Sequence, residues 1–116
     1  MTLGERAVEY HVPGTNCAQC ILLAAKEYTG LSADQCMRIG MGFGGGLRSG
    51  EICGAISGAV MCLGLCGKGD AKTVKDFVST FREFNGCVRC IELKGHGIPC
   101  DDLILYAGNL LEENIK

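Results

Sequence analysis

The chain is 116 residues long, a length that suits one domain with its own hydrophobic core. Hydrophobic residues make up 47% of it and tryptophan is absent, so aliphatic side chains, methionine and cysteine must fill most of that core. With a net charge of −2 and its basic residues scattered, the sequence excludes an electrostatic surface for nucleic acid.

The first half of the chain predicts two helices followed by a loop. After a lead-in over residues 1–14, apolar residues recur with helical spacing over about residues 16–28. Gly30 ends this helix, and the capping-box pattern Ser32-Ala33-Asp34-Gln35 starts a short second one. Five of the seven residues from 40 to 46 are glycine, which disfavours a helix, so we expect a glycine-rich loop there.

The segment over residues 52–65 predicts the central helix of the fold. Small residues recur at every fourth position along one face of it, namely Gly54, Gly58, Cys62 and Cys66. Small residues in a row let another backbone come close, a packing device best known from membrane helices. Cys53 would lie at the first turn, where unpaired amides and the helix dipole favour a thiolate over a thiol.

The second half predicts two further long helices. Asp70 caps a helix that ends at Asn85-Gly86, and Pro99 precedes a last helix over about residues 100–114. Between them, residues 87–100 suggest a turn or two of helix and a loop. No alternating strand pattern is present, so we expect an all-α fold, a small single-domain bundle of about five helices with a glycine-rich loop before the central helix. The apolar stripes of the last two long helices would also suit a homodimer.

Nine cysteines are the strongest signal in the composition. In a secreted miniprotein they would indicate a disulfide scaffold, but the number is odd and no signal peptide is visible. The apolar stretch at 52–65 is too short and too rich in glycine to cross a bilayer, so we expect a cytoplasmic protein without membrane insertion. In a reducing compartment such cysteines are metal ligands, redox thiols or core residues.

Two CxxC pairs, Cys17/Cys20 and Cys87/Cys90, narrow the chemistry. Cys17 opens a helix and should be the more nucleophilic thiol of its pair. Cys20, one turn later, is either its resolving partner in thiol–disulfide exchange or a core residue on the buried stripe.

The spacing Cys87-x2-Cys90-x5-His96-x3-Cys100 resembles a zinc knuckle in its length. A zinc knuckle, however, has four residues on each side of its histidine, where this chain has five and three. His11 and His96 fall in expected loops without a paired carboxylate pattern, which gives no argument for a hydrolase. Three further cysteines lie in apolar helical stripes and are expected to be inert core residues: Cys36, Cys62 and Cys66.

Several spaced elements occur in one order over nearly the whole chain. They are Asn16-Cys17-Ala18-Gln19, Gly42-Phe43-Gly44-Gly45-Gly46, Cys53-Gly54-Ala55-Ile56-Ser57-Gly58-Ala59, Cys90-x-Glu92-Leu93 and Cys100. In this arrangement the chain resembles the redox-active protein family labelled C_GCAxxG_C_C. The label writes its core as GCAxxG, where this chain reads CGAISG.

The resemblance implies four signature cysteines, namely Cys17, Cys53, Cys90 and Cys100. Cys20 and Cys87 would then be additional cysteines, which weakens the CxxC interpretation. A similar domain is found in split-Soret cytochromes, where an iron–sulfur cluster accompanies the haems. This chain has no CxxCH haem-attachment motif, so only a cluster would carry over.

Helix starts are expected near Cys17, Cys53 and Cys100, with Cys90 just before the last helix. If these ends converge, helix dipoles would surround the thiolates, and the amides of Gly44, Gly45 and Gly46 would donate hydrogen bonds to them or to a cofactor. Our leading hypothesis is a redox-active thiol protein in which the four cysteines exchange electrons with a redox partner, as dithiol/disulfide or through a metal centre. The alternatives are a structural or binding module held by an iron–sulfur cluster or zinc, and an interaction domain with buried cysteines.

Overall fold

The computed structural model describes all residues from 1 to 116 and contains eight α-helices and no sheet. The helices are α1 (Leu3–Glu9), α2 (Cys17–Ala24), α3 (Lys26–Thr29), α4 (Ala33–Gly40), α5 (Gly54–Leu65), α6 (Ala71–Asn85), α7 (Cys90–Gly95) and α8 (Cys100–Ile115). The predicted all-α class is confirmed. The predicted number of about five helices is wrong.

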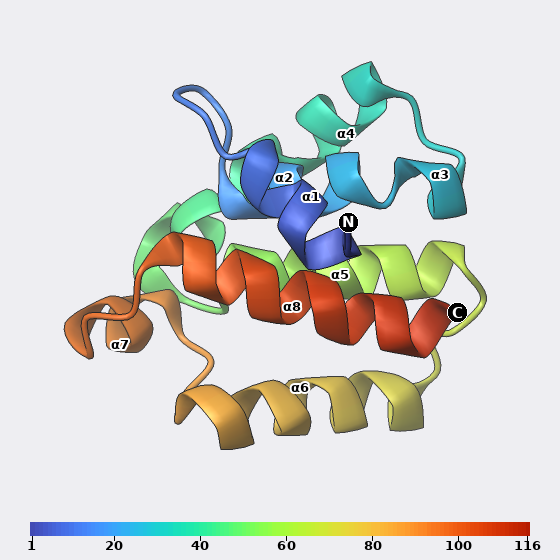
Figure 1. Cartoon of the computed structure of the whole chain (residues 1–116). Helices are drawn as coiled ribbons and strands as arrows, with labels where there is room; N and C mark the ends of the chain where they lie inside the picture. The colour runs from blue at the N-terminus through green and yellow to red at the C-terminus, as the bar shows by residue number, and fades with distance from the viewer.

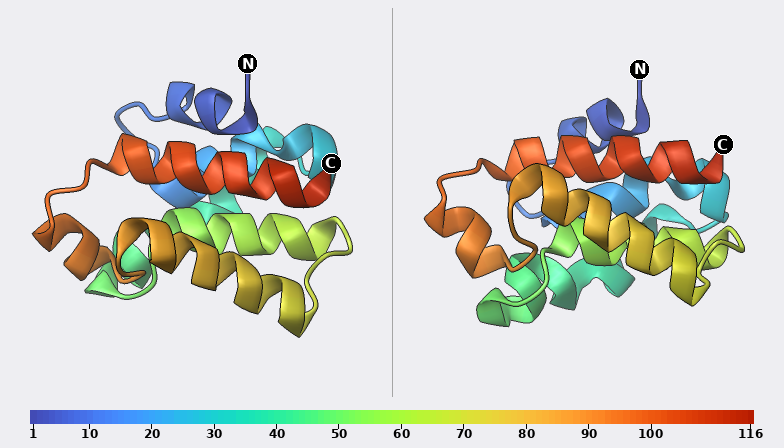
Figure 2. Two further views of the ribbon diagram at one scale, coloured as in Figure 1. Left: turned by 60° about the horizontal axis from the view of Figure 1, so that its bottom comes forward. Right: turned by 90° about the horizontal axis from the view of Figure 1, so that it is seen from below.

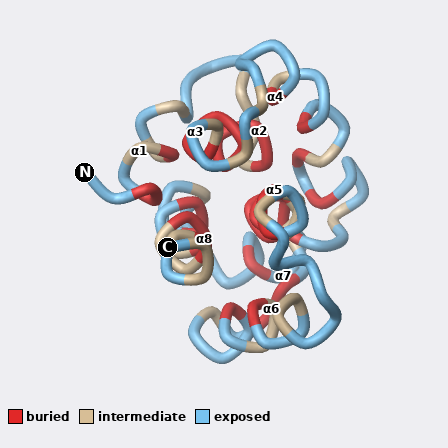
Figure 3. The backbone as a smooth tube through the Cα atoms, turned by 90° about the vertical axis from the view of Figure 1, so that its right-hand side faces the viewer, coloured by how far each residue is buried: buried red, intermediate tan, exposed pale blue.

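Helix α5 lies at the centre of the molecule. It packs against α2 on one side and α8 on another, and α1 packs across α8 (Figure 1). Helix α6 runs alongside α5 and α8 and contacts both (Figure 2). Buried residues concentrate where α2, α5 and α8 face one another (Figure 3). None of the helices combines the length and the apolar character that a bilayer-spanning segment needs.

The small residues of α5 allow the close packing that the sequence predicts. A Cβ atom added at Gly58 would lie 2.9 Å from the backbone oxygen of Ala18 in α2, which is closer than real Cβ contacts. Cys62, one turn further along the same face, is fully buried. Helix α5 therefore approaches the backbone of α2 as closely as glycine permits.

The three additional helices have distinct causes. Residues 1–14 were expected to be a lead-in, but Thr2 and Glu5 form a capping box that starts α1, in which each side chain accepts a hydrogen bond from the other's backbone amide. The expected helix over 16–28 is two helices because the backbone leaves helical geometry at Ala25, with φ −94° and ψ 4°. The segment after Cys90 forms the complete short helix α7.

The glycine-rich segment is a compact series of tight turns rather than an open loop. A 3₁₀ turn (Met41–Phe43) leads into a π-type turn (Gly46–Gly50). Four consecutive residues, 45–48, have φ between 58° and 65°, and the last two of them are Leu47 and Arg48. Left-handed geometry costs non-glycine residues about 1–2 kcal/mol each, so this turn stores backbone strain.

Replacing Leu47 with glycine should therefore stabilise the protein. The Leu47 side chain is 51% exposed, so its removal sacrifices little burial while it relieves the left-handed strain. We expect the free energy of unfolding to rise by about 0.5–1 kcal/mol in urea titrations. The matched control is Leu65→Gly, since Leu65 is 52% exposed in the last turn of α5 and the same change there should destabilise by about 1 kcal/mol. A loss of stability in Leu47→Gly would show that the left-handed geometry of Leu47 does not strain the protein.

Candidate functional site

A small cavity of about 130 Å³ lies where several helices begin. Four cysteine side chains line it: Cys17, Cys53, Cys90 and Cys100. Cys17, Cys90 and Cys100 are the first residues of α2, α7 and α8, and Cys53 is the residue that precedes α5. The starts of α5, α7 and α8 meet at the left of the molecule in Figure 1. The structure thus brings together all four cysteines that the resemblance selected, and it places Cys90 at a helix start as well.

The position of Cys17 is fixed by the cap of its helix. Asn16 and Gln19 form a capping box, in which the Asn16 side chain accepts from the Gln19 amide and Gln19 accepts from the Asn16 amide. The Asn16 side-chain amide also donates to the carbonyl oxygens of Gly40 and Met41, at 3.0 and 3.2 Å. The start of α2 and the glycine-rich segment are therefore held together as one unit.

Backbone pairing holds Cys53 beside Cys90. The Cys53 amide donates to the Val88 carbonyl at 2.9 Å, and the Cys90 amide donates to the Glu51 carbonyl at 2.6 Å. These two bonds flank an isolated antiparallel bridge between residues 52 and 89. Two segments distant in sequence thus deliver their cysteines to the same wall of the cavity.

The thiol of Cys17 lies in surroundings that favour a thiolate. A hydrogen bond from the Cys53 thiol, together with the backbone amides of Ala18 and Gly45, lowers the pKa of Cys17 to about 6, although burial opposes this. The same hydrogen bond and burial raise the pKa of Cys53, which is only 3% exposed. The pKa values of the two thiols are therefore shifted in opposite directions, which makes Cys17 the more acidic thiol of the pair.

Gly54 makes room for the Cys17 sulfur at the start of α5. A Cβ atom at this position would lie 2.5 Å from that sulfur and 2.8 Å from the carbonyl oxygen of Phe43. Both distances are too short for any residue other than glycine. The glycine that follows Cys53 thus allows Cys17 to lie directly against the first turn of α5.

Two charged groups and a histidine accompany the thiols. His11 and Lys94 line the cavity, and His11 Nδ1 lies 2.6 Å from Asp101 Oδ1, next to Cys100 in the chain. The contact between Nδ1 and the carboxylate fixes the orientation of the imidazole ring at the edge of the cavity. The pKa of Cys100 is raised by burial and by the negative charge of Cys17. Sequence reasoning missed the His11–Asp101 pair because its members lie 90 positions apart.

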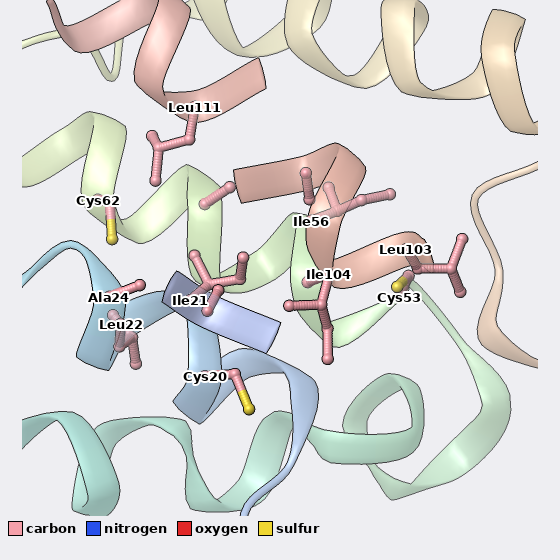
Figure 4. Packing of buried hydrophobic residues seen from close by; sticks show 14 of the residues in the cluster. Cys20, Ile21, Leu22, Ala24, Cys53, Ile56, Cys62, Leu103, Ile104 and Leu111 are labelled. Carbon is pink, nitrogen blue, oxygen red and sulfur yellow. The ribbon is translucent and has the colours of Figure 1, made fainter. Parts of the chain in front are cut away.

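The remaining cysteines lie outside the cavity. Cys20 is fully buried with its sulfur 3.8 Å from Thr15 Oγ1, and burial raises its pKa to about 11. Cys36 and Cys62 are also fully buried, and burial raises the pKa of Cys62 to about 12. Figure 4 shows Cys53 beside Leu103 of α8 and Cys62 at the opposite end of α5. The Cys17/Cys20 motif therefore does not present two thiols to one site.

The four residues of the zinc-knuckle-like segment lie in two separate places. Cys90 and Cys100 line the cavity, whereas the Cys87 sulfur lies 3.8 Å from His96 Nδ1, and neither of these two lines the cavity. No group of three or more histidine, cysteine, aspartate or glutamate side chains is arranged to hold a metal ion. The thiols as placed thus do not form a zinc site. As a donor set, four cysteines on one cavity fit an iron–sulfur cluster, whose irons take cysteine thiolates.

The three candidate glycines have different positions. Gly45 lines the thiol cavity and Gly44 lines an adjoining groove. Gly46 is buried, and a Cβ there would collide with the backbone of Glu51. Gly46 therefore closes the turn, while Gly44 and Gly45 border the site.

A family model described as "Putative redox-active protein (C_GCAxxG_C_C)" matches residues 15–114. The chain belongs to this family. The match covers nearly the whole chain, and it confirms the resemblance seen in the spaced cysteine and glycine elements. Comparisons with curated proteins and with solved structures found no match. In this C_GCAxxG_C_C protein, one cavity collects the thiols of Cys17, Cys53, Cys90 and Cys100.

Proposed function

We propose that this protein is a dithiol redox protein in which Cys17 and Cys53 form the reactive pair. The observation that carries the proposal is that both side chains line one cavity, where the Cys17 sulfur lies against Gly54, the residue that follows Cys53. The shifts of the two pKa values in opposite directions support it, because they make Cys17 the more acidic thiol of the pair. A thiolate is the species that attacks disulfides. An activated thiol beside a protonated partner is the arrangement that such exchange requires.

The reaction would proceed in two exchanges. The Cys17 thiolate attacks one sulfur of an external disulfide, which forms a mixed disulfide and releases the first thiolate. Cys53 then loses its proton and attacks the Cys17 sulfur, so that the Cys17–Cys53 disulfide forms and the second thiolate leaves. Two cysteine thiols are oxidised, one disulfide is reduced to two thiols, and the redox partner in a reducing cytoplasm would run the reverse reaction.

The other groups of the cavity would assist these steps. His11, oriented by Asp101, would take up the proton that Cys53 releases and return it to a departing thiolate. Cys90 and Cys100 line the same cavity and would accept the disulfide in turn, which extends the site to four cysteines.

A second candidate function is a binding or structural module that holds an iron–sulfur cluster. The observation that favours it is that four thiols from four separate helix starts line one cavity. Cys17, Cys53, Cys90 and Cys100 would be the ligands, and the cluster would supply one-electron transfer. Zinc is a weaker candidate because the thiols are not grouped around one point.

The composition of protein purified without oxygen distinguishes the two candidates. We expect folded protein with nine titratable thiols and without stoichiometric iron or acid-labile sulfide. A small disulfide should then consume two of the thiols in the wild type and leave no intramolecular disulfide in Cys17→Ser. Cys66→Ser, which changes a partly exposed cysteine outside the cavity, serves as the control. Stoichiometric iron and sulfide would contradict the dithiol proposal and support the cluster.

A further inference from the structure

An open groove of about 440 Å³ adjoins the thiol cavity. The two share Asn16, Gly45, Cys90 and Lys94 in their linings, so the groove leads directly to the cysteines. Its outer wall is the glycine-rich turn with its left-handed residue Arg48.

The charged side chains that line the groove are all positive. Arg48 and Lys94 are the only charged residues that line it, and neither makes a salt bridge. The nearest carboxylates in sequence, Glu51 and Glu92, both pair with Arg89, at 3.3 and 3.9 Å, and do not line the groove. On a chain with a net charge of −2, this groove presents two unneutralised cations beside a reactive thiol site.

The strained glycine-rich turn forms part of the groove. Residues held in left-handed geometry at a cost often mark functional positions. Here the strained segment sets Arg48 on the groove wall, where its guanidinium donates to the Met41 carbonyl. Arg48 and Lys94 therefore face the groove from two different segments of the chain, the glycine-rich turn and α7.

We propose that this groove binds the anionic part of a small disulfide or thiol, such as one that carries carboxylates, and so selects the substrate of the cysteine pair. The inference rests on the proposed dithiol function. With its negative group between Arg48 and Lys94, the substrate would direct its disulfide toward Cys17. The Cys17 thiolate would displace one anionic thiolate, and Cys53 would displace the second and leave the Cys17–Cys53 disulfide.

The test uses three small disulfides of different charge: dithiodiglycolate, which is anionic, 2-hydroxyethyl disulfide, which is neutral, and cystamine, which is cationic. The rate at which each oxidises the reduced protein is measured at low salt in the wild type, Arg48→Gln and Lys94→Gln. Each reagent is compared only with itself across variants, because leaving-group thiols differ in reactivity. Lys75→Gln, on the exposed side of α6, is the matched control.

We expect Arg48→Gln and Lys94→Gln each to slow oxidation by dithiodiglycolate roughly tenfold, to slow oxidation by 2-hydroxyethyl disulfide much less, and not to slow oxidation by cystamine. The effect on the anionic reagent should shrink at high salt. Equal changes in rate for all three reagents, or no change for any of them, would overturn the proposal that the groove binds the anionic group of the substrate. If 2-hydroxyethyl disulfide fails to oxidise the wild-type pair, the proposed function itself fails, so the two failures are distinguishable. The Lys94 side chain is exposed on α7, so Lys94→Gln should fold normally and keeps the test valid if Arg48→Gln folds poorly.

Discussion

Replacing Gly54 with alanine should cost the protein both stability and the reactivity of Cys17. The added methyl group would lie 2.5 Å from the Cys17 sulfur and 2.8 Å from the Phe43 carbonyl oxygen, so one of these groups must move. Overpacking of this kind costs roughly 1–3 kcal/mol. We expect that loss in urea unfolding. We also expect slower alkylation of Cys17 at pH 7, because the displaced sulfur would lose its hydrogen bond from Cys53.

Two other glycines of α5 provide matched controls for Gly54→Ala. At Gly58 a Cβ would meet the backbone of Ala18, so Gly58→Ala should destabilise the protein through α2–α5 packing. At Gly64 a Cβ would meet nothing within 4 Å, so Gly64→Ala should raise the free energy of unfolding by about 0.5–1 kcal/mol. If Gly54→Ala matches Gly64→Ala in both stability and Cys17 alkylation, the Cys17 sulfur does not lie against Gly54 as described.

Alkylation of Cys17 should show an unusually acidic pH profile. Only the thiolate reacts with iodoacetamide, so the rate rises with pH as the thiol ionises and levels off above its pKa. With the pKa of Cys17 lowered to about 6, mainly by the Cys53 hydrogen bond, the midpoint should fall near that value. An ordinary cysteine has its midpoint near about 8.5. Mass spectrometry of the labelled peptides resolves the site.

The hydrogen bond from Cys53 can be tested within the same experiment. Cys53→Ala removes the donor, so the midpoint for Cys17 should move upward toward that of an ordinary thiol. Cys53→Ser keeps a hydroxyl donor and should move it less. A wild-type midpoint near about 8.5 would show that Cys17 is not activated. An unchanged midpoint in Cys53→Ala would show that the activation comes from elsewhere.

Most of the secondary structure was accessible from the sequence because its signals are local. The capping box at Ser32, the cap at Asp70 and the small-residue face of α5 all depend on residues within one or two turns. The same logic applied to Thr2 and Glu5 would have found α1. The break at Ala25 has no comparable signal, since alanine is the strongest helix former.

The cavity itself could not be predicted from the sequence. The spaced cysteines indicated which thiols to consider, but three contacts that define the site join distant parts of the chain. They are Cys17 with Cys53, the backbone pairing beside Cys90, and His11 with Asp101. The left-handed geometry of Leu47 and Arg48 was also hidden, because neither residue type favours it. Both features follow from tertiary packing, on which local patterns carry no information.

The central claim is that Cys17 and Cys53 form the first disulfide when the protein is oxidised. Reduced protein is treated with one equivalent of 2-hydroxyethyl disulfide, remaining thiols are blocked, and the disulfide-linked peptides are identified by mass spectrometry. The account predicts a Cys17–Cys53 linkage as the main product, and a trapped mixed disulfide on Cys17 in Cys53→Ser. A first disulfide that excludes Cys17, for example one that joins Cys62 to Cys66, would contradict it.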